Sequence, residues 1–133
     1  MKIKKKTWEP LKFNKDGMTK WHWKCQYHEN FKCGKYVDIS SFVFINAKYG
    51  VEMEEGVQVG PHAAILSAST IDDKHGKVVI KKNACIGSHA VIMPNVHIGK
   101  NSIIGACSFV NKDIPDNVIA CGVPVRIIKR IKK

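Results

Sequence analysis

The sequence predicts an all-β fold, a parallel β-helix built from six-residue repeats. Every sixth residue from Ile80 to Val110 is isoleucine or valine. Three of these isoleucines are followed directly by a glycine: Gly87, Gly99 and Gly105. The residue four positions after each member of the series is mostly small. A hexapeptide period is typical of a parallel β-helix, in which each unit is one short strand and one bend. We therefore expect the β-branched residues to point inward and stack, with three units closing each triangular turn.

The same period continues upstream, with an interruption. Residues six apart are Cys33, Ile39, Ile45 and Val51, and after two extra residues Val59, Ile65 and Ile71 resume the register. Nine residues instead of six separate Ile71 from Ile80, so we expect residues 72–77, DDKHGK, to leave the β-helix as a small loop. Insertions in repeat proteins map to loops on one face, which is often the binding face.

Three regions follow from this pattern: an N-terminal cap over residues 1–32, the β-helix over 33–114, and a closing loop and helix over 115–133. The cap is rich in aromatic residues, in WHWKCQYHENFKC. His22, Cys25, His28 and Cys33 lie in or beside it, but their spacing has no CxxC pair, so no metal is predicted. Pro115 and Pro124 should end regular strand pairing, and residues 125–133 are expected to form a short amphipathic helix.

Charge is concentrated at the two ends of the chain. Lysine and arginine number 22 against 11 acidic residues, and the basic excess lies before residue 37 and after residue 125. Such ends attract anions such as phosphorylated small molecules or membrane surfaces, or simply solvate the chain. Arginine is scarce, so no nucleic acid is expected. Five cysteines without a signal peptide or an apolar span indicate reduced thiols, a cytoplasmic protein and no stable membrane insertion.

Residues 78–129, which end in NKDIPDNVIACGVPVRIIK, resemble the hexapeptide-repeat acyltransferases. The resemblance is to sugar acetyltransferases of the maltose, galactoside and capsular-polysaccharide type. It implies a left-handed β-helix, a homotrimer, and acetyl-CoA bound in the groove between neighbouring subunits. The implied activity is acetyl-CoA-dependent O- or N-acetylation of a sugar or nucleotide-linked (amino)sugar acceptor, in surface polysaccharide biosynthesis.

The resemblance also implies which residues bind the cofactor. Ser88 and Ala106 would line the pantetheine arm through backbone contacts. Lys112 and Arg126 would lie near the CoA phosphates, which agrees with the basic C-terminal end. The alternative for these two side chains is an ordinary solvated surface position.

The expected general base is absent from its usual position. The resemblance implies a histidine just before the inserted loop, where it takes the proton from the acceptor hydroxyl, but this chain has Thr70 there. His62 and His75 are the leading substitutes, and His89 is a third.

A base is not required if the acceptor is an amine, because a neutral amine is already nucleophilic. Asp72 or Asp73 could then orient the acceptor. Asn46 matches the position at which the resembling enzymes have an asparagine that holds the acceptor.

Two other functions remain open. A γ-type carbonic anhydrase would use the same fold with three histidines on zinc. The candidates His62, His89 and His97 are 27 and 8 residues apart, which does not match that class. A non-catalytic scaffold would dock its basic tail, RIIKRIKK, on an anionic membrane or partner.

Overall fold

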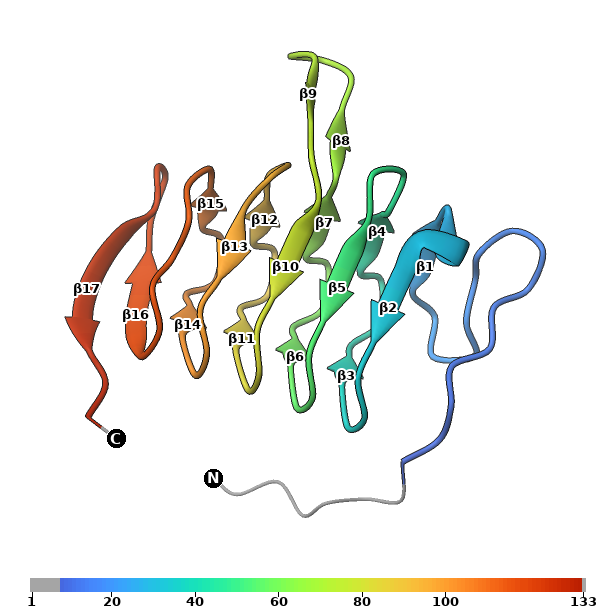
Figure 1. Cartoon of the computed structure of the whole chain (residues 1–133), viewed down its shortest axis with the longest axis horizontal. Coiled ribbons are helices and arrows are strands. Elements are labelled where there is room, and N and C mark those ends of the chain that lie inside the picture. The colour runs from blue at the N-terminus through green and yellow to red at the C-terminus, as the bar shows by residue number, and fades with distance from the viewer. Residues whose placement is uncertain (1–7, 133) are drawn as a thin grey trace.

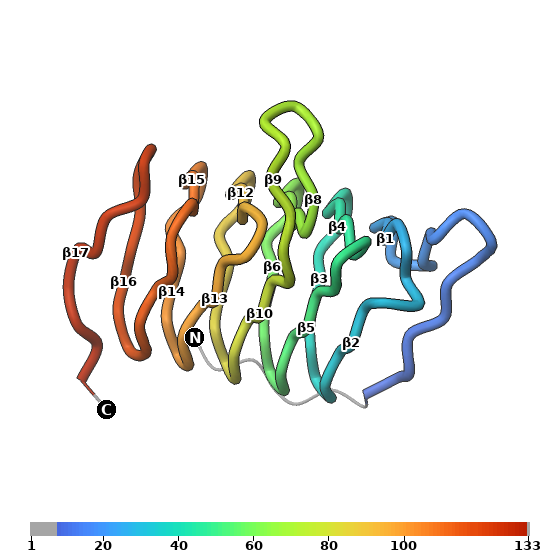
Figure 2. Tube along the Cα trace, turned by 45° about the horizontal axis from the view of Figure 1, so that its top comes forward, coloured from blue at the N-terminus to red at the C-terminus, as the bar shows by residue number. Residues whose placement is uncertain are grey.

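The computed structural model describes residues 8–132, so residues 1–7 of the expected cap and residue 133 of the tail lie outside it. The chain winds through three sheets, parallel except for the last strand, that form the sides of a triangular prism (Figures 1 and 2). Side A contains β1 (Lys24–Gln26), β4 (Phe44–Asn46), β7 (Ala64–Leu66), β12 (Val91–Ile92) and β15 (Phe109–Val110). Side B contains β2 (Phe31–Cys33), β5 (Val51–Met53), β10 (Val78–Ile80) and β13 (His97–Ile98). Side C contains β3 (Asp38–Ile39), β6 (Gln58–Val59), β11 (Cys85–Ile86), β14 (Ile103–Ile104), β16 (Val118–Cys121) and β17 (Arg126–Arg130).

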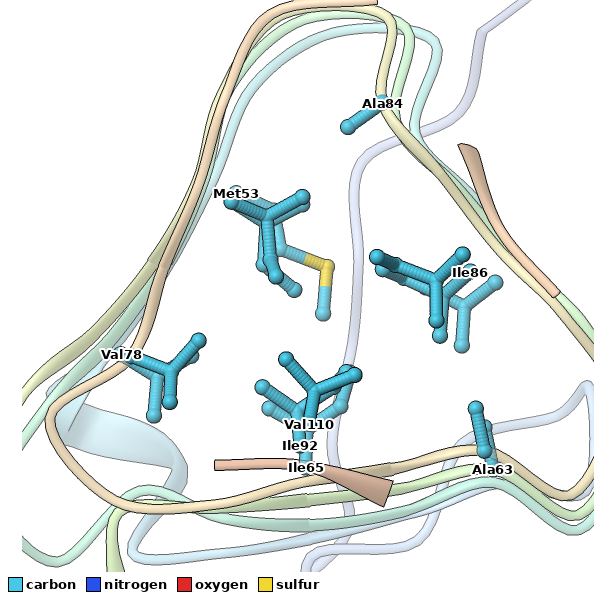
Figure 3. Close-up of a cluster of buried hydrophobic side chains, with 14 of the residues drawn as sticks. Met53, Ala63, Ile65, Val78, Ala84, Ile86, Ile92 and Val110 are labelled. Carbon is cyan, nitrogen blue, oxygen red and sulfur yellow. The ribbon is translucent and has the colours of Figure 1, made fainter. Parts of the chain in front are cut away.

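The residues predicted to point inward stack on their equivalents in neighbouring coils and form columns inside the prism, here called the inner columns. On side A, the strand register aligns Ile65, Ile92 and Val110, and all three side chains are fully buried (Figure 3). Each strand of side A has only two or three residues, so it is stabilised by its neighbours above and below and by burial. Full burial of an isoleucine contributes about 1.5–3 kcal/mol. The six-residue period from Ile80 to Val110 is therefore confirmed as the interior of the prism.

The upstream register differs from the prediction at two positions. Met53, not Val51, aligns with Ile80, because β5 has three residues and turns both of its ends inward. Ile71 is not an inner residue, since its side chain is 99% exposed. The extruded segment is accordingly longer than predicted and forms an antiparallel hairpin of β8 (Ala68–Ser69) and β9 (Lys74–His75), which projects from the prism (Figure 1).

Both ends of the coil stack extend beyond the predicted bounds. At the start, β1 pairs in parallel with β4, and the short 3-10 helix η1 (His28–Asn30) joins it to β2. At the end, β16 pairs in parallel with β14, beyond Pro115. Between these strands Ile114 forms a parallel bridge to Ile98.

The predicted C-terminal helix is wrong. Residues 126–130 form β17, antiparallel to β16, after the chain reverses at Gly122, whose φ is +107°. Every residue of β17 is exposed, so this segment buries no apolar face of the kind that stabilises an amphipathic helix. Pairing with β16 instead satisfies the backbone groups along an otherwise open strand edge.

The N-terminal segment packs its aromatic rings against the first coil. Trp23 is buried and meets Phe13 and Phe31 edge to face, with ring centroids 5.6 and 6.1 Å away. His28 stacks on Phe13 at 4.7 Å. Within residues 8–132, no three histidine, cysteine or acidic side chains gather in a way that could hold a metal ion.

Candidate active site

The sequence-predicted site residues fall mainly on two edges of the prism. The hairpin corner comprises the bends from side A to side B, residues 47–50, 67–77, 93–96 and 111–113, together with the strand ends that enter them. The histidine corner comprises the bends from side C to side A, residues 40–43, 60–63, 87–90 and 105–108. Of the predicted residues, the hairpin corner carries Asn46, Asp72, His75 and Lys112, and the histidine corner carries His62, Ser88 and Ala106.

Three rings form a stacked column along the histidine corner. The centroids of Phe42 and His62 are 5.1 Å apart, and those of His62 and His89 are 4.8 Å apart with ring planes 14° from parallel. All three residues have φ between 61° and 66° and occupy equivalent bends of successive coils. Parallel strands repeat at about 4.8 Å, which is also a stacking distance for flat rings. The repeat itself therefore places these exposed rings in contact.

Glycine at the preceding bend positions lets the coils of this corner approach closely. A Cβ on Gly60 would lie 2.7 Å from the backbone nitrogen of Ser88, and one on Gly87 would lie 2.6 Å from that of Ala106. The backbone nitrogen of Cys107 donates a 2.9 Å hydrogen bond to the carbonyl of Ser88. The predicted cofactor-binding residues Ser88 and Ala106 are thus neighbours along one edge of the prism.

Ser88 also contacts the ring column. Its Oγ lies 2.9 Å from the carbonyl oxygen of Pro61 and 2.9 Å from Nδ1 of His89. The Ser88 hydroxyl therefore connects the imidazole of its own coil to the backbone of the coil before it.

A different set of contacts builds the hairpin corner. The ring of Tyr49 lies 4.8 Å from the ring of His75 on β9. The Tyr49 backbone nitrogen donates to Oγ of the buried Ser67 at 3.0 Å, and that oxygen is 3.5 Å from Oδ1 of Asn46. The structure therefore brings Asn46 and His75 to one corner, where Tyr49 and Ser67 link them. Neither Tyr49 nor Ser67 was identified from the sequence.

The hairpin tip holds a charged cluster. The Ser69 hydroxyl donates a hydrogen bond to the Asp72 carboxylate and lowers the pKa of Asp72 below its ordinary value, and Lys74 at 3.6 Å lowers it further. Thr70 is exposed beside this cluster, in the turn of the hairpin. An ionised carboxylate here can accept a hydrogen bond from a hydroxyl or an amine.

The two predicted phosphate-binding side chains lie toward the C-terminal end of the prism. Lys112 is exposed in the last bend of the hairpin corner, and Arg126 is exposed at the start of β17. His97, which the carbonic anhydrase hypothesis requires, lies in β13 on side B, whereas His62 and His89 lie on the histidine corner. One chain does not bring these three histidines together.

The fold and the six-residue repeats resemble those of the hexapeptide-repeat transferases. Residues 77–112 match the family model described as bacterial transferase hexapeptide (six repeats). The chain carries the repeat of this family from β10 to the bend after β15. It is 35% identical over 120 residues to the galactoside O-acetyltransferase of Lactococcus lactis, an alignment that covers 79% of this chain and 58% of that protein.

Two solved structures extend the comparison. A hexapeptide-repeat acetyltransferase of Vibrio cholerae complexed with acetyl-CoA matches with a TM-score of 0.79 and 26% identity, over 84% of this chain and 66% of that one. AntD, an N-acyltransferase of Bacillus cereus, was solved as a variant with dTDP-4-amino-4,6-dideoxyglucose and coenzyme A. It matches with a TM-score of 0.71 and 25% identity, over 87% of this chain and 80% of that one.

The chain spans less than two thirds of the length of the Lactococcus relative. Within residues 8–132, no helix is both long and apolar enough to cross a membrane.

Proposed function

We propose that the protein is an acetyl-CoA-dependent acetyltransferase whose acceptor is a sugar or a nucleotide-linked (amino)sugar, acting in surface polysaccharide biosynthesis. The observation that carries this proposal is the glycine-spaced histidine corner, on which Ser88 and Ala106 lie side by side. Pantetheine has amide groups along its length, which can hydrogen-bond to backbone groups at the bends of such an edge. Lys112 and Arg126, farther toward the C-terminal end, suit the CoA phosphates.

The active enzyme in this proposal is a homotrimer. The hairpin corner and the histidine corner lie on different edges of one prism, so a site that uses both needs two chains. In a trimer of parallel prisms, the histidine corner of one subunit faces the hairpin of the next. Acetyl-CoA would then run along the former, while Asn46, Asp72 and His75 of the neighbour meet the acceptor.

The chemistry is a transfer of the acetyl group from sulfur to oxygen or nitrogen. The acceptor atom bonds to the thioester carbonyl carbon, the carbon–sulfur bond breaks, and the proton lost by the acceptor ends on the CoA sulfur. A hydroxyl acceptor needs a base such as His62 or His75, whereas a neutral amine needs only orientation, for which Asp72 is placed. The likeness to AntD supports an amine among the candidate acceptors.

Calorimetry and product analysis test this proposal together. We expect acetyl-CoA to bind at sub-millimolar concentrations, and mass spectrometry to find one acetyl group added to a galactoside, a maltoside or dTDP-4-amino-4,6-dideoxyglucose. Failure to bind acetyl-CoA at millimolar concentration overturns the proposal. Lys112→Ala and Arg126→Ala should weaken acetyl-CoA binding and leave binding of acetyl-pantetheine, which lacks the nucleotide phosphates, unchanged.

A further inference from the structure

We propose that His89 is the proton acceptor in acetyl transfer and that Ser88 positions it by fixing its tautomer. The inference rests on the proposed acetyltransferase function and identifies a base for it, because Thr70 cannot serve as one. It is carried by the hydrogen bonds of Ser88 and by the ring column of the histidine corner, two observations that do not depend on each other.

The hydrogen bonds of Ser88 determine which nitrogen of His89 carries the proton. The Ser88 hydroxyl has one hydrogen, and its Oγ lies 2.9 Å from two groups, the Pro61 carbonyl and Nδ1 of His89. A carbonyl oxygen only accepts, so the hydroxyl donates to Pro61 and Nδ1 of His89 donates to Oγ. The Nε2 atom of His89 is then unprotonated and has a free lone pair.

The ring column holds the imidazole of His89 in place. His62 stacks on it at 4.8 Å, and Phe42 stacks on His62 at 5.1 Å, so the His89 ring is supported on one face by two further rings. The side chain is nevertheless exposed to solvent and accessible to a second molecule. Other enzymes activate hydroxyl nucleophiles with a base that a third group orients by a hydrogen bond, as Ser88 does here at Nδ1 of His89.

The other titratable side chains of the corner do not have this arrangement. His62 makes ring contacts to Phe42 and His89, and Cys107 donates its backbone N–H to the Ser88 carbonyl. His22 lies at the start of the same corner, and its carbonyl accepts from the backbone nitrogen of Phe42. Along this column, His89 is therefore the imidazole with a polar group oriented against Nδ1.

In the proposed step, the acceptor atom bonds to the thioester carbonyl carbon as its proton passes to Nε2 of His89. The carbon–sulfur bond then breaks, and the sulfur takes the proton from Nε2. Histidine returns to its starting tautomer, and the products are the acetylated acceptor and free CoA. No oxidant, reductant or metal takes part, so atoms and electrons balance within the two substrates.

The tautomer is tested by nitrogen NMR of the ¹⁵N-histidine-labelled protein, above the pH at which imidazole is protonated. In the wild-type protein we expect the His89 Nδ1 resonance in the protonated range and Nε2 in the unprotonated range. Ser88→Ala should shift the population toward the opposite tautomer, and Ser88→Thr, which keeps the hydroxyl, should not. A wild-type His89 protonated on Nε2 overturns the proposal.

The role in transfer is tested by kinetics of His89→Asn, because asparagine tolerates the φ of +61° found at this bend. We expect kcat to fall by about 10²–10⁴-fold, the range for loss of a general base, with acetyl-CoA affinity unchanged by calorimetry. Added imidazole should partly restore kcat in this variant and not in the wild type. The matched control is His97→Asn on side B, which should keep full activity.

The outcomes separate this inference from the proposed function. If the wild-type protein acetylates an acceptor and His89→Asn is equally active, His89 is not the base and the inference alone is overturned. If the wild-type protein binds no acetyl-CoA and transfers nothing, the proposed function is overturned and this inference with it.

Discussion

The inner columns of the prism and its two corners arise from the same six-residue repeat, but different interactions hold them. In the columns, side chains such as Ile92 are fully buried, and stability comes from excluded water and close contact. At the corners, His62 and His75 are exposed and are held by ring contacts. In the inner columns, replacing one apolar side chain by another of equal volume should therefore cost less stability than changing its volume. At the corners, the volume of a side chain matters less than its functional groups.

The largest difference between the two regions should appear in the free energy of unfolding. Ile92→Ala removes three methyl or methylene groups from a fully buried site and should lower that free energy by about 2–5 kcal/mol. Ile71→Ala makes the same chemical change on the hairpin, where the side chain is 99% exposed, and should change it by less than about 0.5 kcal/mol. Urea unfolding at fixed protein concentration measures both. Equal losses in the two variants would mean that the columns do not carry the stability.

Cysteine reactivity compares the same regions chemically. Burial raises the pKa of the Cys25 thiol to about 12, with a smaller contribution from Glu29, and burial raises that of Cys33 to about 12 as well. Both residues occupy inner columns, whereas Cys107 is exposed on the histidine corner. Since the thiolate is the reactive form, at pH 8 iodoacetamide should label Cys107 at least about 10²-fold faster than Cys25 or Cys33.

Peptide mass spectrometry over a time course measures these rates. In concentrated urea the three cysteines should react at similar rates, which shows that the protection belongs to the fold. Rapid labelling of Cys25 in the native protein would place it outside the buried column.

The inner columns could be predicted from the sequence because burial imposes a period that composition reveals. The prediction was wrong at Ile71, which is exposed. Val51 is buried as predicted, but it aligns with Val78 and not with Ile80, so the predicted register is displaced there. The prediction was wrong again at residues 126–130, whose apolar and basic residues suit a helix as well as a strand. The segment forms a strand because β16 has an unpaired edge, and the local sequence of residues 126–130 contains no information about that edge.

The ring column was missed at the level of the sequence because its members are unevenly spaced. Phe42, His62 and His89 are 20 and 27 residues apart, because the first interval contains two extra residues and the second contains the hairpin. The contact of Tyr49 with His75 depends on the path of the hairpin, which lies outside the repeat. A search for polar or aromatic residues at equivalent bends of successive coils would have found the ring column but not this contact.

The smallest expected effect concerns Asp72 at the hairpin tip, where the corner is most exposed to solvent. Because its pKa in the folded protein lies below the ordinary value of about 3.9, the ionised carboxylate is favoured by folding. Its contribution is present above about pH 4 and is lost as the pH falls through the lowered pKa. Ser69→Ala should raise the pKa of Asp72 more than Lys74→Ala does, because the Ser69 hydrogen bond is the larger cause and the lysine is screened by water.

Carboxyl-detected NMR titration of the three proteins measures this order directly. Hydrogen exchange of the β8–β9 amides reports the structural consequence, which should be a lower protection factor at pH 3 than at neutral pH, confined to the hairpin. The amides of the inner strands are the internal control, since their protection comes from burial and not from a titrating group. If Lys74→Ala shifts the pKa of Asp72 more than Ser69→Ala does, the tip is held by charge instead of by the hydroxyl hydrogen bond.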